Sequence, residues 1–415
     1  MPFSRLGLSP HILRALQKSG FVDPTAIQEK VIPLVLERHD VMARAQTGSG
    51  KSASFVLPIL ELWMRSKGEG KAKIKALILT PTRELTLQVA EAFETFGEFL
   101  PKQPKVVSVI GGESIGDQLY AIQQGCDILV ATSGRLLDVV KKRQMNLSHL
   151  EFFVLDEADK MLDLGFAEEL ELILQEIPIQ RQNLLFSATY PPKMVAIASK
   201  ITRNPVEITL ESEEPTVMSI TQRVIEVNRE NRGPLLRHLL NTEKWEQVLV
   251  FMANKRAADN IAMKFKKYGF SADSFHGDLL QEERTFTLNQ FKNKKIRILF
   301  ATDIAARGLD IDNITCVINF DLPRSPADYI HRIGRTARAG KSGIAVSFIS
   351  HEDQDHFALI EKRSQIKLVR EQIEGFALTG EAPIKERGPQ PVKGKGKSKK
   401  DKLREQAAKD ASKKI

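Results

Sequence analysis

Ala45-Gln46-Thr47-Gly48-Ser49-Gly50-Lys51-Ser52 follows the short apolar run Val41-Met42-Ala43 near the start of this 415-residue chain. The apolar run predicts a buried strand, and Gly48 and Gly50 would let the backbone after it approach a phosphate closely. Lys51 has the position of a residue that binds β- and γ-phosphates, and the Ser52 hydroxyl suits magnesium. The pattern usually begins with Gly, and Ala45 stands there instead. A turn with a lysine at its tip is the structural alternative, but the strand before it favours a phosphate-binding loop.

Asp156-Glu157-Ala158-Asp159 follows a second strand-like run, Phe152-Phe153-Val154-Leu155. Taken alone, these acids could cap a helix N-terminus, where the helix dipole stabilises them. Carboxylates at the carboxyl edge of a parallel sheet face the crevice in which nucleotides bind. With a phosphate-binding loop upstream, we therefore expect Asp156 to hold a metal ion and Glu157 to activate water.

Short runs of continuous hydrophobicity recur through the first half of the chain and predict strands that are covered on both faces, hence a mainly parallel α/β sheet. They lie at 41–43, 76–79, 106–110, 127–130, 152–155 and 184–186. Leu85, Val89, Phe93, Phe96 and Leu100 recur at steps of three and four after Pro81, which predicts an amphipathic helix.

A second set of strand-like runs follows in the second half of the chain, at 247–251, 271–275, 296–300, 316–320 and 344–348. Asn204-Pro205 and the acidic stretch 211–215 separate the two sets and indicate a linker. The first strand of the second set runs into Met252-Ala253-Asn254-Lys255 rather than into a Gly-rich turn. We expect a first domain at 1–205, a linker at 206–218, a second domain at 219–372 and a tail at 373–415.

His331, Arg335 and Arg338 are spaced by four and three residues, which predicts one face of a helix. A basic exposed face is one interpretation. The other is a pair of arginine fingers that neutralise charge on a γ-phosphate. Because these arginines belong to the second set of strands, catalysis would then require the two halves to close on ATP.

Further strings complete an ordered series: 20–28 with the upstream Phe3, 81–85, 111–112, 132–135, 187–189, 250–251, 281–284, 302–310 and 331–338. Over residues 3 to 350 the chain resembles the DEAD-box ATP-dependent RNA helicases of the compact bacterial kind. The resemblance implies an α/β fold of two tandem RecA-like domains, with ATP and Mg²⁺ as cofactors and RNA as the partner. It also implies local, non-processive separation of RNA strands, followed by ATP hydrolysis and release.

The resemblance further assigns residues to roles. Lys51, Asp156, Glu157, Arg335 and Arg338 would be catalytic, and Ser52 and Asp156 would hold the metal. Phe3, Phe21, Gln28, Asp310 and the run 45–52 would bind the nucleotide, with Gln28 at adenine and Asp310 at the ribose. Asp159, Ser187, Thr189 and His331 would couple hydrolysis to unwinding. RNA backbone would contact Pro81, Thr82, Arg83, Gly111, Gly112, Thr132, Arg135, Arg284, Thr302 and Asp303. Ser52, Thr86, Ser133 and Ala337 depart from the common pattern, and Ser133 replaces a proline that pre-sets a turn.

Most of the net charge of +9 lies at the end of the chain, because residues 381–415 hold twelve Lys or Arg against five acids. Their composition predicts disorder. The tail is either a solvated segment without a specific partner or a tether that gains affinity by releasing counterions from RNA.

The composition also sets limits. No apolar stretch reaches the about 18 residues of a membrane span and no signal peptide is visible, so we expect a cytoplasmic monomer with no membrane partner. Cys126 and Cys316 indicate neither a disulfide framework nor a zinc site. Ribosomal or other ribonucleoprotein components are possible partners. Two alternatives stay open: an RNA clamp that opens no duplexes, and an enzyme that acts on DNA.

Overall fold

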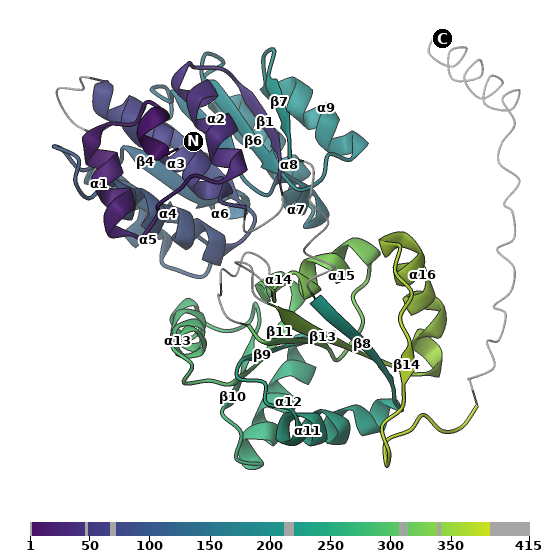
Figure 1. Cartoon of the computed structure of the whole chain (residues 1–415). Coiled ribbons are helices and arrows are strands. Elements are labelled where there is room, and N and C mark those ends of the chain that lie inside the picture. The colour runs from purple at the N-terminus through teal and green to yellow at the C-terminus, as the bar shows by residue number, and fades with distance from the viewer. Residues whose placement is uncertain are drawn as a thin grey trace, which may run out of the picture. The chain divides into compact units, whose positions relative to one another are not determined.

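The computed structural model describes residues 2–45, 49–66, 72–210, 220–306, 311, 314–337 and 342–381. Within them the strands form two sheets of seven strands each. Every strand pair in the described residues is parallel. Both sheets belong to the compact unit that ends at Leu378. The prediction of two mainly parallel sheets flanked by helices is therefore confirmed (Figure 1).

The first lobe, residues 2–210, contains the first sheet. Its strands are β1 (Val41–Arg44), β2 (Ala76–Thr80), β3 (Val106–Val109), β4 (Ile128–Thr132), β5 (Phe152–Leu155), β6 (Gln182–Ser187) and β7 (Val206–Thr209). Its helices are η1 (Phe3–Arg5), α1 (Pro10–Lys18), α2 (Ala26–Leu36), α3 (Lys51–Arg65), α4 (Arg83–Gly97), α5 (Ile115–Gln123), α6 (Ser133–Lys141), α7 (Ala158–Asp163), α8 (Ala167–Glu176) and α9 (Pro192–Ile201).

The second lobe, residues 220–378, contains the second sheet. Its strands are β8 (Ile220–Glu226), β9 (Val248–Met252), β10 (Ala272–Phe275), β11 (Ile298–Thr302), β12 (Cys316–Asn319), β13 (Gly343–Ile349) and β14 (Arg370–Glu371). Its helices are η2 (Arg229–Asn231), α11 (Arg232–Thr242), α12 (Lys255–Lys267), α13 (Gln281–Lys292), α14 (Asp303–Ala306), α15 (Pro326–Ile333), η3 (His351–Asp353) and α16 (Gln354–Ser364).

The two sheets share one topology. The first has the strand order β3-β4-β2-β5-β6-β1-β7 and the second β10-β11-β9-β12-β13-β8-β14, which is the same order when β8 is counted as the first strand. The counterpart of β1 is thus β8, and the strand that runs into Met252–Lys255 is the counterpart of β2. The prediction wrongly took the strand at 247–251 as the first of the second set. It overlooked β8, because β8 carries Thr221, Gln222 and Arg223 and lacks a continuous apolar run.

Three strands were not predicted: β7, β8 and β14. Residues 206–209, expected to open the linker, form β7 and pair with β1. Of its four residues only Ile208 is buried, as befits a strand at the edge of a sheet, so its sequence shows alternation rather than a continuous apolar run. Residues 211–219, the rest of the expected linker, lie outside the described residues.

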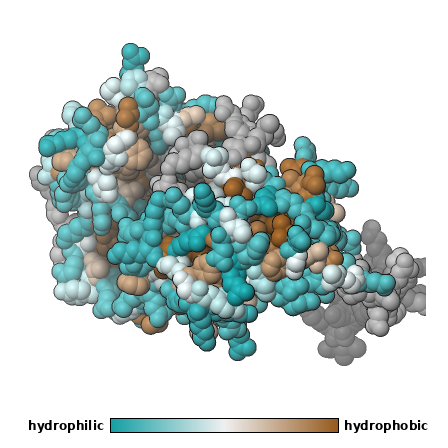
Figure 2. Space-filling view, turned by 60° about the horizontal axis from the view of Figure 1, so that its bottom comes forward, coloured by the Kyte–Doolittle hydropathy of each residue, from teal (hydrophilic) through white to brown (hydrophobic). Residues whose placement is uncertain are grey.

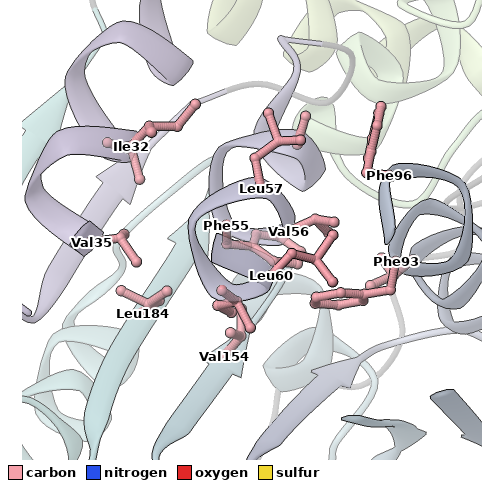
Figure 3. Close-up of a cluster of buried hydrophobic side chains, with 14 of the residues drawn as sticks. Ile32, Val35, Phe55, Val56, Leu57, Leu60, Phe93, Phe96, Val154 and Leu184 are labelled. Carbon is pink, nitrogen blue, oxygen red and sulfur yellow. The ribbon is translucent and has the colours of Figure 1, made fainter. Parts of the chain in front are cut away.

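The first sheet is covered on both faces, as the continuous hydrophobicity of its strands predicted. Along β5, Phe152 and Val154 pack with α2, α3 and α4, whereas Phe153 and Leu155 pack with the helices of the other face. Figure 3 shows the first of these clusters, in which side chains of α3 lie against β5 and β6. Burial of each such side chain contributes about 1.5–3 kcal/mol, so packing against the sheet fixes α3 in place.

The face of the molecule in Figure 2 is mainly polar where residues are described. Figure 2 shows hydrophilic side chains over most of the visible face, with hydrophobic ones in small groups. No helix among the described residues has the length and apolarity to cross a membrane.

Candidate functional site

The predicted phosphate-binding loop leads into α3, and Gly50 is the residue directly before this helix. Gly50 has a φ of +88°, and a Cβ there would lie 2.6 Å from Gln28 Nε2, so only glycine fits without strain. Ala45 donates its backbone N–H to the Ser187 carbonyl. Ser52 is the second residue of α3 and is half-buried. Gln46, Thr47 and Gly48 lie outside the described residues.

Lys51 is the first residue of α3 and is only 6% exposed. Its Nζ atom has no hydrogen-bond partner among the residues that the structure describes. A buried ammonium without a partner is costly, and a helix N-terminus disfavours a cation further. Both costs disappear when an anion binds, so the position fits a phosphate group.

Asp156 follows β5 and is 2% exposed, with Oδ1 accepting the Glu157 N–H at 2.9 Å. Burial raises the pKa of Asp156 to about 6, although Lys51 acts to lower it. A carboxylate held in this way fits a cation. The described residues contain no cluster of three or more His, Cys, Asp or Glu side chains that would enclose a metal. One carboxylate beside a phosphate site is the kind of protein ligation that suffices for Mg²⁺.

Glu157 is surrounded by cations. Its φ of +51° is left-handed, and its Oε1 lies 2.7 Å from Lys160 Nζ. Burial alone would raise the pKa of Glu157, but Lys160, Lys51 and Arg335 outweigh it and hold the pKa at about 2. Glu157 is thus an ionised carboxylate. It contacts the ammonium group of Lys160 in its own helix, and the charge of Arg335 in the second lobe also stabilises it.

Arg335 is 5% exposed and donates from Nε to the His331 carbonyl. The helix predicted from His331 onward ends early: α15 ends at Ile333, and Gly334 caps it. His331 and Arg335 therefore do not share one helical face, because Arg335 follows this cap in a turn, and Ala337 beyond it has a left-handed φ of +56°. Arg335 nevertheless acts on Glu157. Arg338 lies outside the described residues.

Asp159 is bound to the segment that follows β6. Its Oδ2 accepts the Thr189 N–H and hydroxyl, both at 2.9 Å, and its own N–H donates to Ser187 Oγ at 3.2 Å. Ser187 Oγ in turn donates to the Thr189 carbonyl. The start of α7, which carries the acids, is therefore fastened to residues 187–189.

His331 lies in an environment that opposes its protonation. Burial, Lys160 and Arg335 lower the pKa of His331 to about 4, against a smaller effect of Asp159. The imidazole is therefore neutral at pH 7.

Gln28 links the expected adenine-binding segment to the phosphate-binding loop. Its Oε1 accepts the Thr25 N–H at 2.9 Å and its Nε2 donates to the Gly50 carbonyl at 3.1 Å. Phe3 is 4% exposed within the core, whereas Phe21 is 42% exposed and packs edge-on against Phe96. Asp310 lies outside the described residues.

The expected RNA-binding residues of the first lobe follow β2, β3 and β4, which are neighbours in the sheet. Thr82 caps α4 by accepting the Leu85 N–H, and Pro81 precedes it. A Cβ at Gly112 would overlap the Arg83 guanidinium, so Arg83 lies directly against Gly111 and Gly112. Arg135, in the first turn of α6, donates to the Glu113 carbonyl at 2.9 Å. Because α6 begins at Ser133, directly after Thr132, this helix start forms without a proline.

The expected RNA-binding residues of the second lobe have protein partners. Arg284 is 5% exposed; its Nε donates to Glu84 Oε1 of the first lobe at 2.7 Å, and its Nη1 donates to the His276 carbonyl at 3.0 Å. Asp303, directly after Thr302, accepts two hydrogen bonds from Arg332 at 2.6 and 2.7 Å.

Sequence reasoning missed Lys160 and Arg332 as members of the site. Arg332 is 3% exposed and also donates to Asn319 Oδ1 and the Asp321 carbonyl, so it joins the ends of β11 and β12. No sequence pattern near Arg332 indicates which residues it contacts. Lys160 did leave a signal, because residues three apart on a helix are neighbours and Glu157 is acidic.

Two family models and several curated proteins match this chain. The family model described as DEAD/DEAH box helicase matches residues 25–197, and that of the helicase conserved C-terminal domain matches residues 232–340. The DEAD-box ATP-dependent RNA helicase CshA of Geobacillus kaustophilus is 40% identical over 368 residues, which cover 89% of this chain and 78% of the relative. The ATP-dependent RNA helicase DbpA of Bacillus subtilis is 40% identical over 362 residues, with 87% and 74% covered.

Solved structures are similar as well. S. cerevisiae Dbp5 bound to RNA and ADP BeF3 has a TM-score of 0.78 at 30% identity, with 89% of this chain and 95% of that chain covered. Mss116p bound to ssRNA and AMP-PNP has a TM-score of 0.79 at 29% identity, with 90% and 78% covered.

Proposed function

The chain belongs to the DEAD-box ATP-dependent RNA helicases, and from that premise we propose that it binds the RNA backbone across both lobes, closes on ATP and separates short duplexes locally. Hydrolysis of ATP to ADP and phosphate then reopens the lobes and releases the strand. The observation that carries this proposal is one buried cluster. Lys51, Asp156 and Glu157 of the first lobe interact electrostatically there, and Arg335 of the second lobe acts on Glu157.

Each member of the cluster receives a role. Lys51 and the loop 45–52 bind the phosphates, with Ser52 and Asp156 as ligands for Mg²⁺. Mg²⁺ held there would supply positive charge that offsets the negative charge of the phosphates. Glu157 orients the attacking water, and Arg335 with Arg338 stabilises the charge that develops on the transferred phosphoryl group. Phe3, Phe21 and Gln28 bind adenine, and Asp310 binds the ribose.

RNA binding is proposed to depend on the backbone rather than on base sequence. In the first lobe the residues are Pro81, Thr82, Arg83, Gly111, Gly112, Thr132 and Arg135, at the carboxyl ends of neighbouring strands. Arg284, Thr302 and Asp303 complete the set in the second lobe. Backbone N–H groups at helix starts and arginine side chains suit phosphates and carry no base specificity. Asp159, Ser187, Thr189 and His331 couple the two lobes.

The setting of this activity is part of the proposal. We assign the first domain to residues before the 211–219 segment and the second to those after it, so that β7 belongs to the first. The protein acts as a cytoplasmic monomer on RNA or ribonucleoprotein.

The test is RNA-stimulated ATP hydrolysis measured beside displacement of a strand from a short duplex, for wild type and Glu157→Gln. We expect wild type to hydrolyse ATP faster with RNA and to displace the strand, and E157Q to bind ATP but not turn over. Matched RNA and DNA duplexes test the role of the 2′-OH. ATP hydrolysis without strand displacement would identify an RNA clamp instead, and normal turnover by E157Q would remove Glu157 from its role.

A further inference from the structure

We propose that Lys160 is a positioning residue for ATP hydrolysis, whose ammonium group holds the Glu157 carboxylate in the orientation from which Glu157 orients the attacking water. The inference rests on the proposed function, because it needs Glu157 to act on that water. It adds a residue that lies beside the acidic motif and that the resemblance assigned to no role.

The geometry ties these two side chains together. Lys160 is the third residue of α7, Glu157 is its N-cap, and their Nζ and Oε1 atoms are 2.7 Å apart. The side chains are 2% and 3% exposed, so solvent does not compete for the contact. Glu157 also has a left-handed backbone, a conformation that residues with a Cβ adopt at a cost and that is common at functional sites.

Fold stability does not explain a lysine at this position. The pKa of Lys160 is lowered, mainly because burial disfavours its charge. The like charges of Arg335 and Lys51 lower this pKa further, and Glu157 offsets only part of the effect. The first turn of a helix is unfavourable for a cation as well. Since replacing both members of a buried ion pair by apolar side chains often leaves a protein equally or more stable, the needs of the fold alone do not explain the Glu157–Lys160 pair.

The other cations that act on Glu157 have different tasks. Lys51 and Arg335 are the residues that the proposed function assigns to the phosphates, and Arg335 belongs to the second lobe. Lys160 belongs to the same helix as Glu157, so its contact needs neither nucleotide nor closure. It is therefore suited to keep Glu157 in place while Lys51 and Arg335 turn to the substrate.

The experiment compares Lys160→Met and Lys160→Arg in the full-length chain. Readouts are kcat and KM for ATP at saturating RNA, affinity for a non-hydrolysable ATP analogue, and Tm. We expect K160M to lower kcat by about tenfold to a hundredfold, the scale of a misplaced catalytic group. Analogue affinity and KM would stay close to wild type, whereas Tm would fall because the buried Glu157 carboxylate loses this partner. K160R would recover most of the kcat and Tm that K160M loses.

The matched control is Lys200→Met. Lys200 Nζ also lies 2.7 Å from a glutamate oxygen, that of Glu171, but these side chains are 62% and 51% exposed. We expect K200M to leave kcat, KM and analogue affinity unchanged.

Comparison of K160M with E157Q separates the possible failures. A stalled E157Q beside a K160M with wild-type kcat overturns the inference and leaves the proposed function standing, whereas a fully active E157Q overturns the proposed function itself. A K160M that unfolds, loses analogue affinity or is not rescued by arginine shows a structural role and also overturns the inference.

Discussion

At the scale of single residues, charged side chains are buried where the proposed chemistry takes place. Lys51, Asp156, Glu157, Lys160 and Arg335 are each at most 6% exposed. Isolated buried charges are strongly unfavourable, so each must be compensated by its neighbours or by a ligand. The cluster is therefore sensitive to every change in charge nearby.

His331 provides a pH-dependent prediction. Its pKa of about 4 in the folded protein lies below the about 6.5 of an unfolded chain. Between these values the unfolded chain binds a proton that the folded protein does not, so this stability is complete above pH 6.5 and is lost as the pH falls towards 4. From pH 7.5 to 5 we expect wild type to lose about 2 kcal/mol more stability than His331→Gln.

Thermal unfolding of both proteins across this pH range measures the difference. The glutamine variant keeps a polar side chain of similar size but has no titratable group. Stability curves that run parallel from pH 7.5 to 5 would contradict a depressed pKa.

At the scale of elements, both lobes place helix starts after corresponding strands. Thr82 caps α4 after β2, and Asn254 caps α12 after β9, each by accepting the N–H of the residue three positions later. Because β2 and β9 are counterparts in the two sheets, each is followed by a helix whose start is capped in the same way. In the first lobe the sequence adds a predicted phosphate-binding loop at 45–52 and the acidic motif at 156–159.

The link between α7 and the end of β6 gives a prediction at this scale. The double variant Ser187→Ala/Thr189→Ala removes three hydrogen bonds. They run from the Asp159 N–H to Ser187 Oγ, from Ser187 Oγ to the Thr189 carbonyl, and from the Thr189 hydroxyl to Asp159 Oδ2. The acids remain in place, so ATP hydrolysis stays near wild type. Strand displacement falls about tenfold, the scale of a coupling energy between sites.

Strand displacement per ATP hydrolysed is the quantity to measure. Ser199→Ala is the control, because the Ser199 hydroxyl donates within α9, at the surface. Equal losses of hydrolysis and displacement in the double variant would show a general defect and contradict the coupling role.

At the scale of the whole molecule, charged residues lie in two settings: a buried ion pair between the two lobes and a basic segment at the end of the sequence. The Glu84–Arg284 ion pair joins them, with both side chains at most 6% exposed. The sequence places most of the positive charge elsewhere, in residues 381–415.

Deleting residues 381–415 tests the role of that charge. If the tail neutralises phosphates, the deletion makes the slope of log affinity against log salt shallower, by about 0.7 for each phosphate of single-stranded RNA that the tail had neutralised. A full-length variant with the twelve Lys and Arg of this segment changed to Gln is expected to behave like the deletion. An unchanged slope in both variants would reject the tether and leave a solvated tail.

The sequence by itself determined the fold class and the residue types of the candidate site. Continuous apolar runs require coverage on both faces, and the residue types of the run 45–52 predict a loop that binds phosphate through its own backbone, so both are local properties that a sequence displays. The edge strand β7 and the polar strand β8 escaped prediction because their pairing, not their composition, makes them strands.

Tertiary structure alone decided which partners two of the buried arginines receive. Arg284 meets Glu84 and Arg332 meets Asp303, partners that lie far away in the sequence. It also ended α15 before Arg335 and brought the charge of Arg335 to act on Glu157. The physical reason is that a guanidinium suits a phosphate and a carboxylate equally well, and only the folded chain determines which of them lies within its reach.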